Sequence, residues 1–320
     1  MITGEKFRII QQCTARDNNV LSISEMCNVA GVSRSGYYNW IACELVRNSR
    51  EMQDRANFEL IKNAFNYRGY AKGARSIHMR LLHEGVLFNE KKIRRLMKKY
   101  GLKCPFRNAN PYRRMAKALK TSNTFPNVVD RKFSESGPRK ILLTDITYLF
   151  YTGHVCYLST IIDACTKEVL AYRVSQSLEV SFVIETVEEL CHVHGAEVDN
   201  TTIIHSDQGC HYTSYAFIDK LKEEGFIQSM SRRGNCWDNA PQESFFGHMK
   251  DEIADTIKGY TEFEQVKDRL DDWIDYYNNE RYNPQLKKLS PTEYYAYLTT
   301  GVDPLADIQP NRGSAPDPGV

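Results

Sequence analysis

The sequence predicts an α/β part, a mixed five-stranded sheet flanked by helices, that follows a set of all-α units. Apolar residues recur at helical spacing between residues 20 and 101, whereas β-branched and aromatic runs alternate with helical segments from residue 139 onward. A basic stretch rich in Pro, Asn and Ser separates the two regions. Strands and helices that alternate in this way form one sheet covered by helices.

The composition is that of a globular protein. The chain has 320 residues, more than most single domains, so we expect two or three folding units. No apolar run approaches the ~18 residues of a membrane span, and the first residues lack the pattern of a secretory signal. Nine scattered cysteines without a Cys-x-x-Cys pair predict reduced thiols rather than disulfides or a zinc finger. We therefore expect a cytoplasmic protein with no membrane partner.

Positive charge is concentrated in the middle of the chain. Residues 91–140 contain 16 Lys or Arg residues against only Asp130 and Glu135, although the net charge of the whole chain is +2. Such a basic stretch favours binding to a polyanion, and nucleic acid is the natural candidate. A solvated basic linker without a specific partner is the alternative at this point.

Residues 21–40 have the spacing of a helix-turn-helix unit. The pattern predicts a short helix over 24–30, a turn at Gly31 and a second helix with Ser33 as its N-cap. The second helix of such a unit enters the DNA major groove, although a plain helical hairpin would have the same spacing. The candidate DNA contacts on this helix are Ser33, Arg34, Ser35 and Tyr37.

A second helical region covers residues 55–101, where the apolar spacing predicts three helices. Gly85 ends the middle helix, and Asn89 caps the third, which stops at Gly101. The polar face of the third helix is almost wholly basic, as expected for a helix that lies against DNA phosphates. Its candidate DNA contacts are Lys91, Lys92, Arg94, Arg95, Lys98 and Lys99.

The remaining chain divides into a linker, an α/β unit and a tail. Residues 102–138 lack periodicity, and Arg113 and Arg114 within them are further candidate DNA contacts. The tail is rich in Pro, Gly and Asp without a core-forming stripe, so we expect it to be flexible. The predicted division is a helix-turn-helix-like region 1–50, a helical DNA-binding domain 51–101, a basic linker 102–138, the α/β core 139–300 and the tail 301–320.

Five strands are predicted within the α/β unit. The first three are ILLTDITYLFY, HVCYLSTIID and EVLAYRVS, and the short spacing between them indicates an antiparallel meander. TTIIHSD and FIQSMS are the later strands, and helices over about 179–193 and 214–224 precede them. The order βββαβαβ, followed by further helices, predicts a mixed sheet.

Three acidic residues carry the strongest chemical signal. Asp145 lies within an apolar strand, where a charge is costly to bury unless it meets a cation or a metal. Asp207 closes the apolar run IIHSD, at the strand end where α/β sheets usually build ligand sites. Glu243 lies early on a helix that has Pro241 in its first turn. Each residue alone is compatible with a turn, a cap or a surface position, but together they predict an oxygen-ligand site for Mg²⁺ or Mn²⁺.

This pattern of residues suits phosphodiester chemistry. Two metal ions about 4 Å apart activate the attacking oxygen and stabilise the leaving oxygen in a displacement at phosphorus. Lys250 lies two helical turns after Glu243 on the same face and could hold a DNA phosphate. Arg232 and Arg233 could assist it.

With these residues, the chain resembles the retroviral-integrase-like transposases of the bacterial insertion sequence three family, specifically their second-frame product. The resemblance covers about residues 20–295. In the α/β part it is carried by TDITY with Asp145, IIDACTKEVLAY with Asp163, HSDQGCHYTS with Asp207, SRRGNCWDNAPQESFFGHMKDE with Glu243, and YYNNERYNPQLKKLSPTEYY with Arg281. Three segments before it resemble the DNA-binding helices of that family: VSRSGYYNW, YRGYAKGARSIHMRLLHEG and EKKIRRLMKKYGLK. Some relatives carry His at the position of Asn283.

The resemblance implies an RNase H-like fold and a metal-dependent polynucleotidyl transferase. Its catalytic and metal-binding triad would be Asp145, Asp207 and Glu243, and its phosphate-binding lysine Lys250. The implied substrates are terminal inverted repeats and target DNA: hydrolytic nicking frees a 3′-OH, and that hydroxyl then attacks another strand. The implied location is the bacterial nucleoid.

Members of this family commonly act as multimers on DNA. Their active form often arises by frameshift fusion to an upstream frame that carries a further helix-turn-helix and a leucine zipper. No sustained leucine heptad is present in this sequence. We therefore expect a first-frame protein as a partner or as a fusion.

Three other functions explain parts of the sequence. A retroviral integrase proper would carry an N-terminal zinc module of two His and two Cys residues, which the sequence lacks. A structure-specific nuclease would not need two helical DNA-binding units and a basic connector. A DNA-binding regulator, or a catalytically incomplete second-frame product, would bind DNA without cleaving it, but all three carboxylates are present.

Overall fold

The computed structural model describes residues 2–70, 72–104, 136–231, 240–306 and 308. Its internal contacts divide the chain into two compact units, residues 1–63 with 95–102 and residues 64–94 with 103–320. The first unit is all-α, and the second contains one β-sheet with flanking helices. Within the described residues, no helix combines the length and the hydropathy that crossing a membrane requires.

Helices α1 (Thr3–Thr14), α2 (Ile23–Ala30) and α3 (Arg34–Ala42) form a small bundle in the first unit. Their core includes Phe7, Ile10, Met26 and Cys27. Gly31 ends α2 in a left-handed conformation with φ of 62°, and Ser33 Oγ accepts a hydrogen bond of 3.1 Å from the backbone NH of Gly36 to cap α3. The predicted helix, turn and cap are confirmed, whereas the sequence pattern did not reveal α1.

The prediction that Tyr37 contacts DNA is wrong. Its side chain is only 4% exposed, and its ring packs edge-on against Phe7 with the ring centroids 6.0 Å apart. The residue belongs to the core of the three-helix bundle because α1, which was not predicted, covers that side of α3.

Three further helices follow, as the apolar spacing predicts: α4 (Glu44–Asn66), α5 (Ala74–His83) and α6 (Glu90–Lys99). Helix α4 begins earlier than expected. Gly85 follows the end of α5 with φ of 75°, and Asn89 Oδ1 accepts a hydrogen bond of 2.8 Å from the backbone NH of Lys91 at the start of α6. The predicted stop and cap therefore lie where the sequence indicates.

The sheet has five strands in the order β3-β2-β1-β4-β5. Strands β1 (Ile141–Tyr151), β2 (His154–Asp163) and β3 (Val169–Ser175) form an antiparallel meander, and β4 (Ile203–Ser206) and β5 (Ile227–Met230) extend it in parallel to β1. The prediction of a mixed five-stranded sheet with the order βββαβαβ is confirmed, and the arrangement is RNase H-like.

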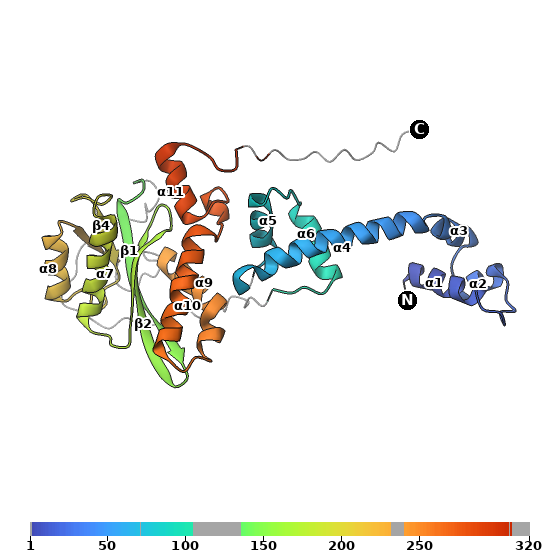
Figure 1. Cartoon of the computed structure of the whole chain (residues 1–320), viewed down its shortest axis with the longest axis horizontal. Helices are drawn as coiled ribbons and strands as arrows, with labels where there is room; N and C mark the ends of the chain where they lie inside the picture. Colours follow the sequence, from blue (N-terminus) through green and yellow to red (C-terminus); the bar gives the residue numbers. More distant parts are fainter. Residues whose placement is uncertain (1, 71, 105–135, 232–239, 307, 309–320) are drawn as a thin grey trace. The chain divides into compact units, whose positions relative to one another are not determined.

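Helices cover both faces of this sheet (Figure 1). Helices α7 (Val180–His194) and α8 (Tyr215–Glu223) pack on one face, and α9 (Ala240–Ile257) and α10 (Phe263–Asn279) pack on the other; α11 (Pro291–Thr300) follows. Since side chains alternate along a strand, Leu149 and Tyr151 of β1 meet α9, while Leu142 meets α7 and α8. This alternation decides which face of the sheet each polar residue occupies.

Arg139 anchors the beginning of β1 from its buried position, with 4% of the residue exposed. Its guanidinium forms ion pairs with Asp163 at 3.2 Å, Glu168 at 2.8 Å and Glu197 at 2.7 Å. Asp163, which lies in one of the motifs quoted above, is therefore part of a structural ion-pair network.

Candidate active site

Asp145 and Asp207 lie on neighbouring parallel strands. Leu143 of β1 pairs with His205 of β4, and each aspartate stands two residues beyond this pair. Asp145 is still within β1, whereas Asp207 follows the last residue of β4. The alternation of side chains puts Asp145 on the same face of β1 as Leu149, which is the face that α9 covers.

Glu243 and Lys250 lie on α9, and their charges act on the carboxyl group of Asp145. The pKa of Asp145 is raised to about 8, first by burial and next by the negative charge of Asp207; Glu243 acts in the same direction. The backbone NH of Ile146, 2.8 Å from Asp145 Oδ1, and the ammonium of Lys250 lower it. The fold therefore brings these two strand residues and these two helix residues into one neighbourhood.

The loop after β4 holds the carboxylate of Asp207 in place. The backbone NH of Gly209 donates a hydrogen bond of 2.9 Å to Asp207 Oδ1, and a Cβ atom at Gly209 would lie only 2.8 Å from that oxygen. Desolvation raises the pKa of Asp207, although part of the residue faces solvent, and the Gly209 NH lowers it. A larger residue at position 209 would push the Asp207 carboxylate out of this position, a relationship that the Asp-x-Gly spacing of the sequence could have indicated.

The donor set suits a hard cation in its chemistry. Carboxylate oxygens are the ligands that Mg²⁺ and Mn²⁺ prefer, and a divalent cation would favour the charged form of Asp145, whose pKa is raised by burial and by the charge of Asp207. Across the described residues, however, no group of three or more His, Cys, Asp and Glu side chains is arranged to hold a metal ion.

Several basic residues of α6 are engaged in ion pairs. The guanidinium of Arg95 makes two contacts with the carboxylate of Asp54, at 2.7 and 2.8 Å, and Lys99 lies 2.7 Å from the same carboxylate. These hydrogen bonds lower the pKa of Asp54, that from Arg95 most strongly. Arg94 pairs with Glu90. These ion pairs hold α6 to residues of α4 and to its own first turn.

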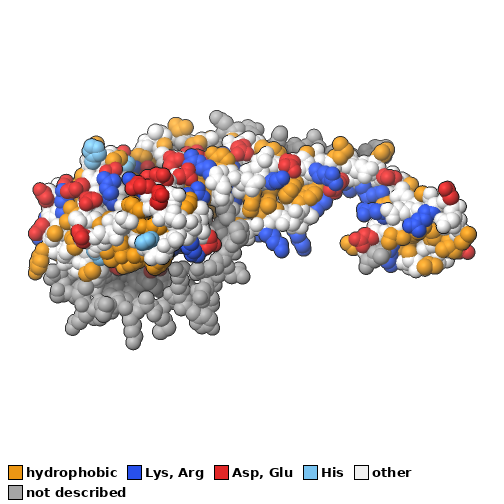
Figure 2. Space-filling model, turned by 60° about the horizontal axis from the view of Figure 1, so that its bottom comes forward, with side chains coloured by type: hydrophobic (Ala, Val, Ile, Leu, Met, Phe, Trp, Pro, Cys, Tyr) orange, Lys and Arg blue, Asp and Glu red, His pale blue; other side chains and the backbone are white. Residues whose placement is uncertain are grey.

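The other candidate DNA contacts have different surroundings. Lys91 and Lys98 are exposed and form no ion pair with another residue of the described chain, while Lys92 lies over the ring of Phe88 at 3.8 Å. Arg34 is exposed on α3. Figure 2 shows Lys and Arg side chains in several separate groups on one face, with Asp and Glu side chains among them. Four predicted contacts lie outside the described residues: Arg113, Arg114, Arg232 and Arg233.

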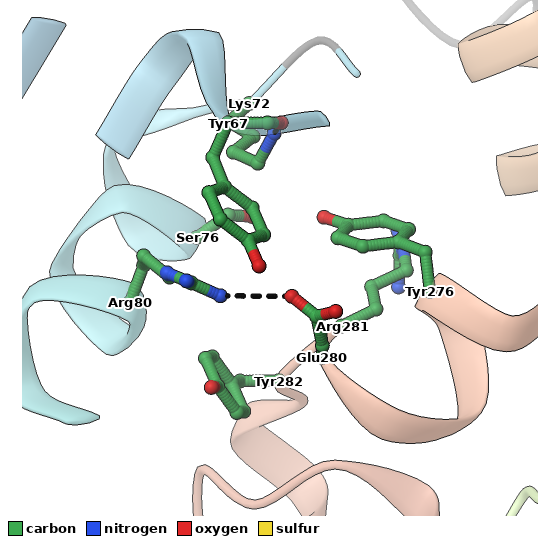
Figure 3. Close-up of a pocket in the computed structure, with 8 residues that line it drawn as sticks. All are labelled: Tyr67, Lys72, Ser76, Arg80, Tyr276, Glu280, Arg281 and Tyr282. Carbon is green, nitrogen blue, oxygen red and sulfur yellow. Dashed lines mark hydrogen bonds and ion pairs between the residues drawn. The ribbon is translucent and has the colours of Figure 1, made fainter. Parts of the chain in front are cut away.

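A second polar cluster lies between α5 and the end of α10 (Figure 3). Arg80 Nη1 is 3.2 Å from Glu280 Oε2, and the guanidinium of Arg80 also stacks over the ring of Tyr67 at 3.4 Å. The cavity between them has room for only about one water-sized molecule. The residues that line it are Tyr67, Lys72, Ser76, Arg80, Tyr276, Glu280, Arg281 and Tyr282. This cluster joins parts of the second unit and is too small to be a substrate site.

Comparison with protein families gives three matches. Integrase core domain models match residues 135–236 and 243–296, and an HTH-like domain model matches residues 52–110. The two integrase core matches contain every strand of the sheet, the helices α7, α8 and α10, and α9 from Glu243 onward.

Several proteins are similar to this chain over most of its length. InsK, named as a transposase of insertion sequence element IS150 of Escherichia coli (strain K12), is 32% identical over 278 residues, 85% of this chain and 93% of that protein. A protein named as a transposase for insertion sequence element IS986/IS6110 of Mycobacterium tuberculosis (strain ATCC 25618 / H37Rv) is 30% identical over 280 residues, 83% of this chain and 96% of that protein.

The similarity to solved structures is remote. A chain of the simian T-cell lymphotropic virus intasome in complex with the PP2A regulatory subunit B56 gamma matches 74% of this chain and 74% of its own length, with 13% identity and a TM-score of 0.44. The catalytic domain of Mos1 mariner transposase matches 43% of this chain and 70% of its own length, with 16% identity and a TM-score of 0.35.

Proposed function

Because the chain belongs to the insertion-sequence transposases with an integrase core domain, we propose that it nicks the ends of its DNA element and joins the freed 3′-OH to another DNA strand. The observation that supports this proposal is that the charges of Asp207, Glu243 and Lys250 all act on the buried carboxyl group of Asp145. Phosphodiester displacement needs negative ligands for a metal and a cation for the phosphate, and this neighbourhood contains both.

We propose that the three carboxylates hold Mg²⁺ or Mn²⁺, with two ions per site. When bound, these ions activate the attacking oxygen and stabilise the leaving oxygen. Asp145 lies within β1 and Asp207 directly after β4, and Glu243 is exposed near the start of α9. Lys250 holds a DNA phosphate next to the carboxylates.

The finer identity proposed is a second-frame product of the insertion sequence three family that binds terminal inverted repeats and target DNA. Helix α3 with Arg34, helix α6 with Lys91 and Lys98, and the basic linker make the phosphate contacts in this proposal. The protein acts as a multimer at the bacterial nucleoid, in the cytoplasm, with a first-frame protein as partner or fusion. The five-part division of the chain given above is part of the same proposal.

The test is cleavage and joining of a labelled DNA that carries the terminal inverted repeat, with Mg²⁺ or Mn²⁺. Asp145→Asn, Asp207→Asn and Glu243→Gln should each abolish both products while DNA binding is retained. Asp219→Asn is the matched control, because Asp219 is an exposed carboxylate on α8, on the other face of the sheet.

The outcomes separate the competing functions. Metal-dependent joined product from the wild type and the control alone would establish strand transfer, while cleaved product without joining would indicate a nuclease. DNA binding without any product would favour a regulator or a second-frame product that requires its fusion partner. Full activity of one of the three variants would remove that residue from the proposed site.

A further inference from the structure

Gln242 is the residue before Glu243, yet the two side chains have opposite environments. Gln242 is 0% exposed, whereas Glu243 is exposed. The amide Nε2 of Gln242 donates a hydrogen bond to Thr160 Oγ1 on β2, and Thr160 is also 0% exposed. A buried side-chain hydrogen bond therefore joins the first turn of α9 to the sheet, directly beside one of the proposed catalytic residues.

Thr160 occupies a special position in the sheet. In the antiparallel ladder of β1 and β2 it pairs with Asp145. Directly opposed residues project their side chains to the same face of a sheet, with their Cβ atoms about 5 Å apart. The hydrogen bond from Gln242 thus joins α9, which carries Glu243, to β2. Its acceptor, Thr160, is the residue of β2 that lies directly beside Asp145 in the sheet.

The apolar packing around α9 would not by itself fix the rotation of this helix about its axis. Phe245, Phe246 and Met249 of α9 pack in the apolar core on the sheet, and apolar contacts tolerate small rotations of a helix about its axis. A hydrogen bond is directional and tolerates less. Gln242 Oε1, moreover, is buried without a partner among the described residues, so an apolar side chain would be cheaper to bury here. Stability alone does not account for an amide at this position.

We propose that Gln242 is a positioning residue, whose hydrogen bond to Thr160 sets the rotation of α9 so that the Glu243 carboxylate is directed toward Asp145 and Asp207. The inference rests on the proposed function, because it assigns to Gln242 the task of placing a metal ligand. Without this bond the apolar contacts of α9 and the polar contacts of Glu252 remain, but Glu252 lies nine residues further along the helix, so the direction of Glu243 in the first turn is less well fixed.

The test measures metal binding and not only activity. In the full chain without DNA, the concentration of Mn²⁺ that half-saturates the rise in unfolding temperature is determined for each variant. Gln242→Met and Thr160→Val each remove the hydrogen bond at nearly constant volume, and each should raise this concentration by about 10- to 100-fold. The double variant should be no worse than either single variant, because both remove the same bond. Thr160→Ser keeps the hydroxyl and should retain the wild-type concentration.

Thr186→Val is the matched control. Thr186 Oγ1 of α7 donates a buried hydrogen bond of 2.9 Å to Ser159 Oγ, next to Thr160 but on the opposite face of β2. This variant should lower the unfolding temperature and leave the Mn²⁺ requirement unchanged. In DNA cleavage, Gln242→Met should reduce kcat without a change in DNA affinity.

Two results would overturn the inference in different ways. If Mn²⁺ stabilises the wild type but not Asp207→Asn, and Gln242→Met keeps the wild-type requirement, the proposed metal site stands and the role of Gln242 is lost. If Mn²⁺ stabilises the wild type and Asp207→Asn equally, the proposed metal site fails, and the positioning role fails with it.

Discussion

The guanidinium of Arg281 forms a buried ion pair with the carboxylate of Glu252, with Nη2 3.0 Å from Oε1. The side chain of Glu252 is 3% exposed and also accepts a hydrogen bond of 2.9 Å from Trp273 Nε1. Glu252 belongs to α9 and Trp273 to α10, while Arg281 follows the end of α10. These contacts of Glu252 therefore hold α9, the helix that also carries Glu243 and Lys250, against α10.

Removal of one partner of this pair should destabilise the protein strongly. Arg281→Met leaves the Glu252 carboxylate buried without its cation, and we expect a loss of about 3–5 kcal/mol in the free energy of unfolding. Replacing both residues, as in Glu252→Gln with Arg281→Met, should recover part of this loss. Urea unfolding measures the wild type and both variants, and a loss below about 1 kcal/mol for Arg281→Met would contradict the buried pair.

Lys72 makes stability depend on pH in the alkaline range. It is 3% exposed, donates a hydrogen bond of 2.9 Å to the carbonyl of Tyr70, and has its pKa lowered to about 8 by burial. Between this value and the ordinary lysine pKa of about 10.4, the unfolded chain binds one more proton than the folded chain, so this group adds stability as pH rises from about 8. Below about pH 8 Lys72 is protonated in both the folded and the unfolded chain, so its contribution to the free energy of unfolding does not change with pH.

The variant Lys72→Met should therefore lose stability relative to the wild type as pH increases from about 8 to 9.5, a range that stays below the ordinary tyrosine pKa. Thermal unfolding of both proteins across this range gives the difference directly. A difference that is independent of pH would show that Lys72 keeps its ordinary pKa in the folded protein.

Two lysines of α6 should contribute to DNA affinity through phosphate contacts. Lys91 and Lys98 are exposed, whereas Arg95 and Lys99 are paired with Asp54. Lys91→Gln and Lys98→Gln should each weaken binding to all sequences and flatten the plot of log affinity against log salt by about one unit of slope. Lys258→Gln is the control, because Lys258 lies at the end of α9 and pairs with Asp255 at 2.7 Å. An unchanged slope for both α6 variants would exclude these phosphate contacts.

Ser33 and Arg34 are neighbours with different tasks. Ser33 caps α3, so Ser33→Ala should reduce the free energy of unfolding by about 1 kcal/mol. Arg34 is exposed, and Arg34→Gln should change stability by less than about 0.5 kcal/mol while it lowers DNA affinity. Chemical unfolding and DNA titration of both variants separate the two effects, and equal losses of stability would contradict this assignment.

The sequence by itself determined the local structure and the candidate carboxylates. Alternation of apolar residues, turn glycines and caps such as Ser33 and Asn89 act within a few residues, so the strands, most helices and their limits could be predicted from them. Asp145 and Asp207 were recognisable because each interrupts or ends an apolar strand, where a charge needs a chemical reason.

The tertiary structure alone decided which residues meet. Arg95 and Lys98 are both basic residues of α6, but Asp54 of α4 pairs with the first, whereas the second forms no ion pair with another residue of the described chain. Tyr37 is buried by α1, and Gln242 reaches Thr160 across 82 positions of sequence. Such pairings depend on strand register and on how helices are rotated against the sheet. A local sequence pattern does not contain this information, because burial and ion pairing arise only when distant segments pack together.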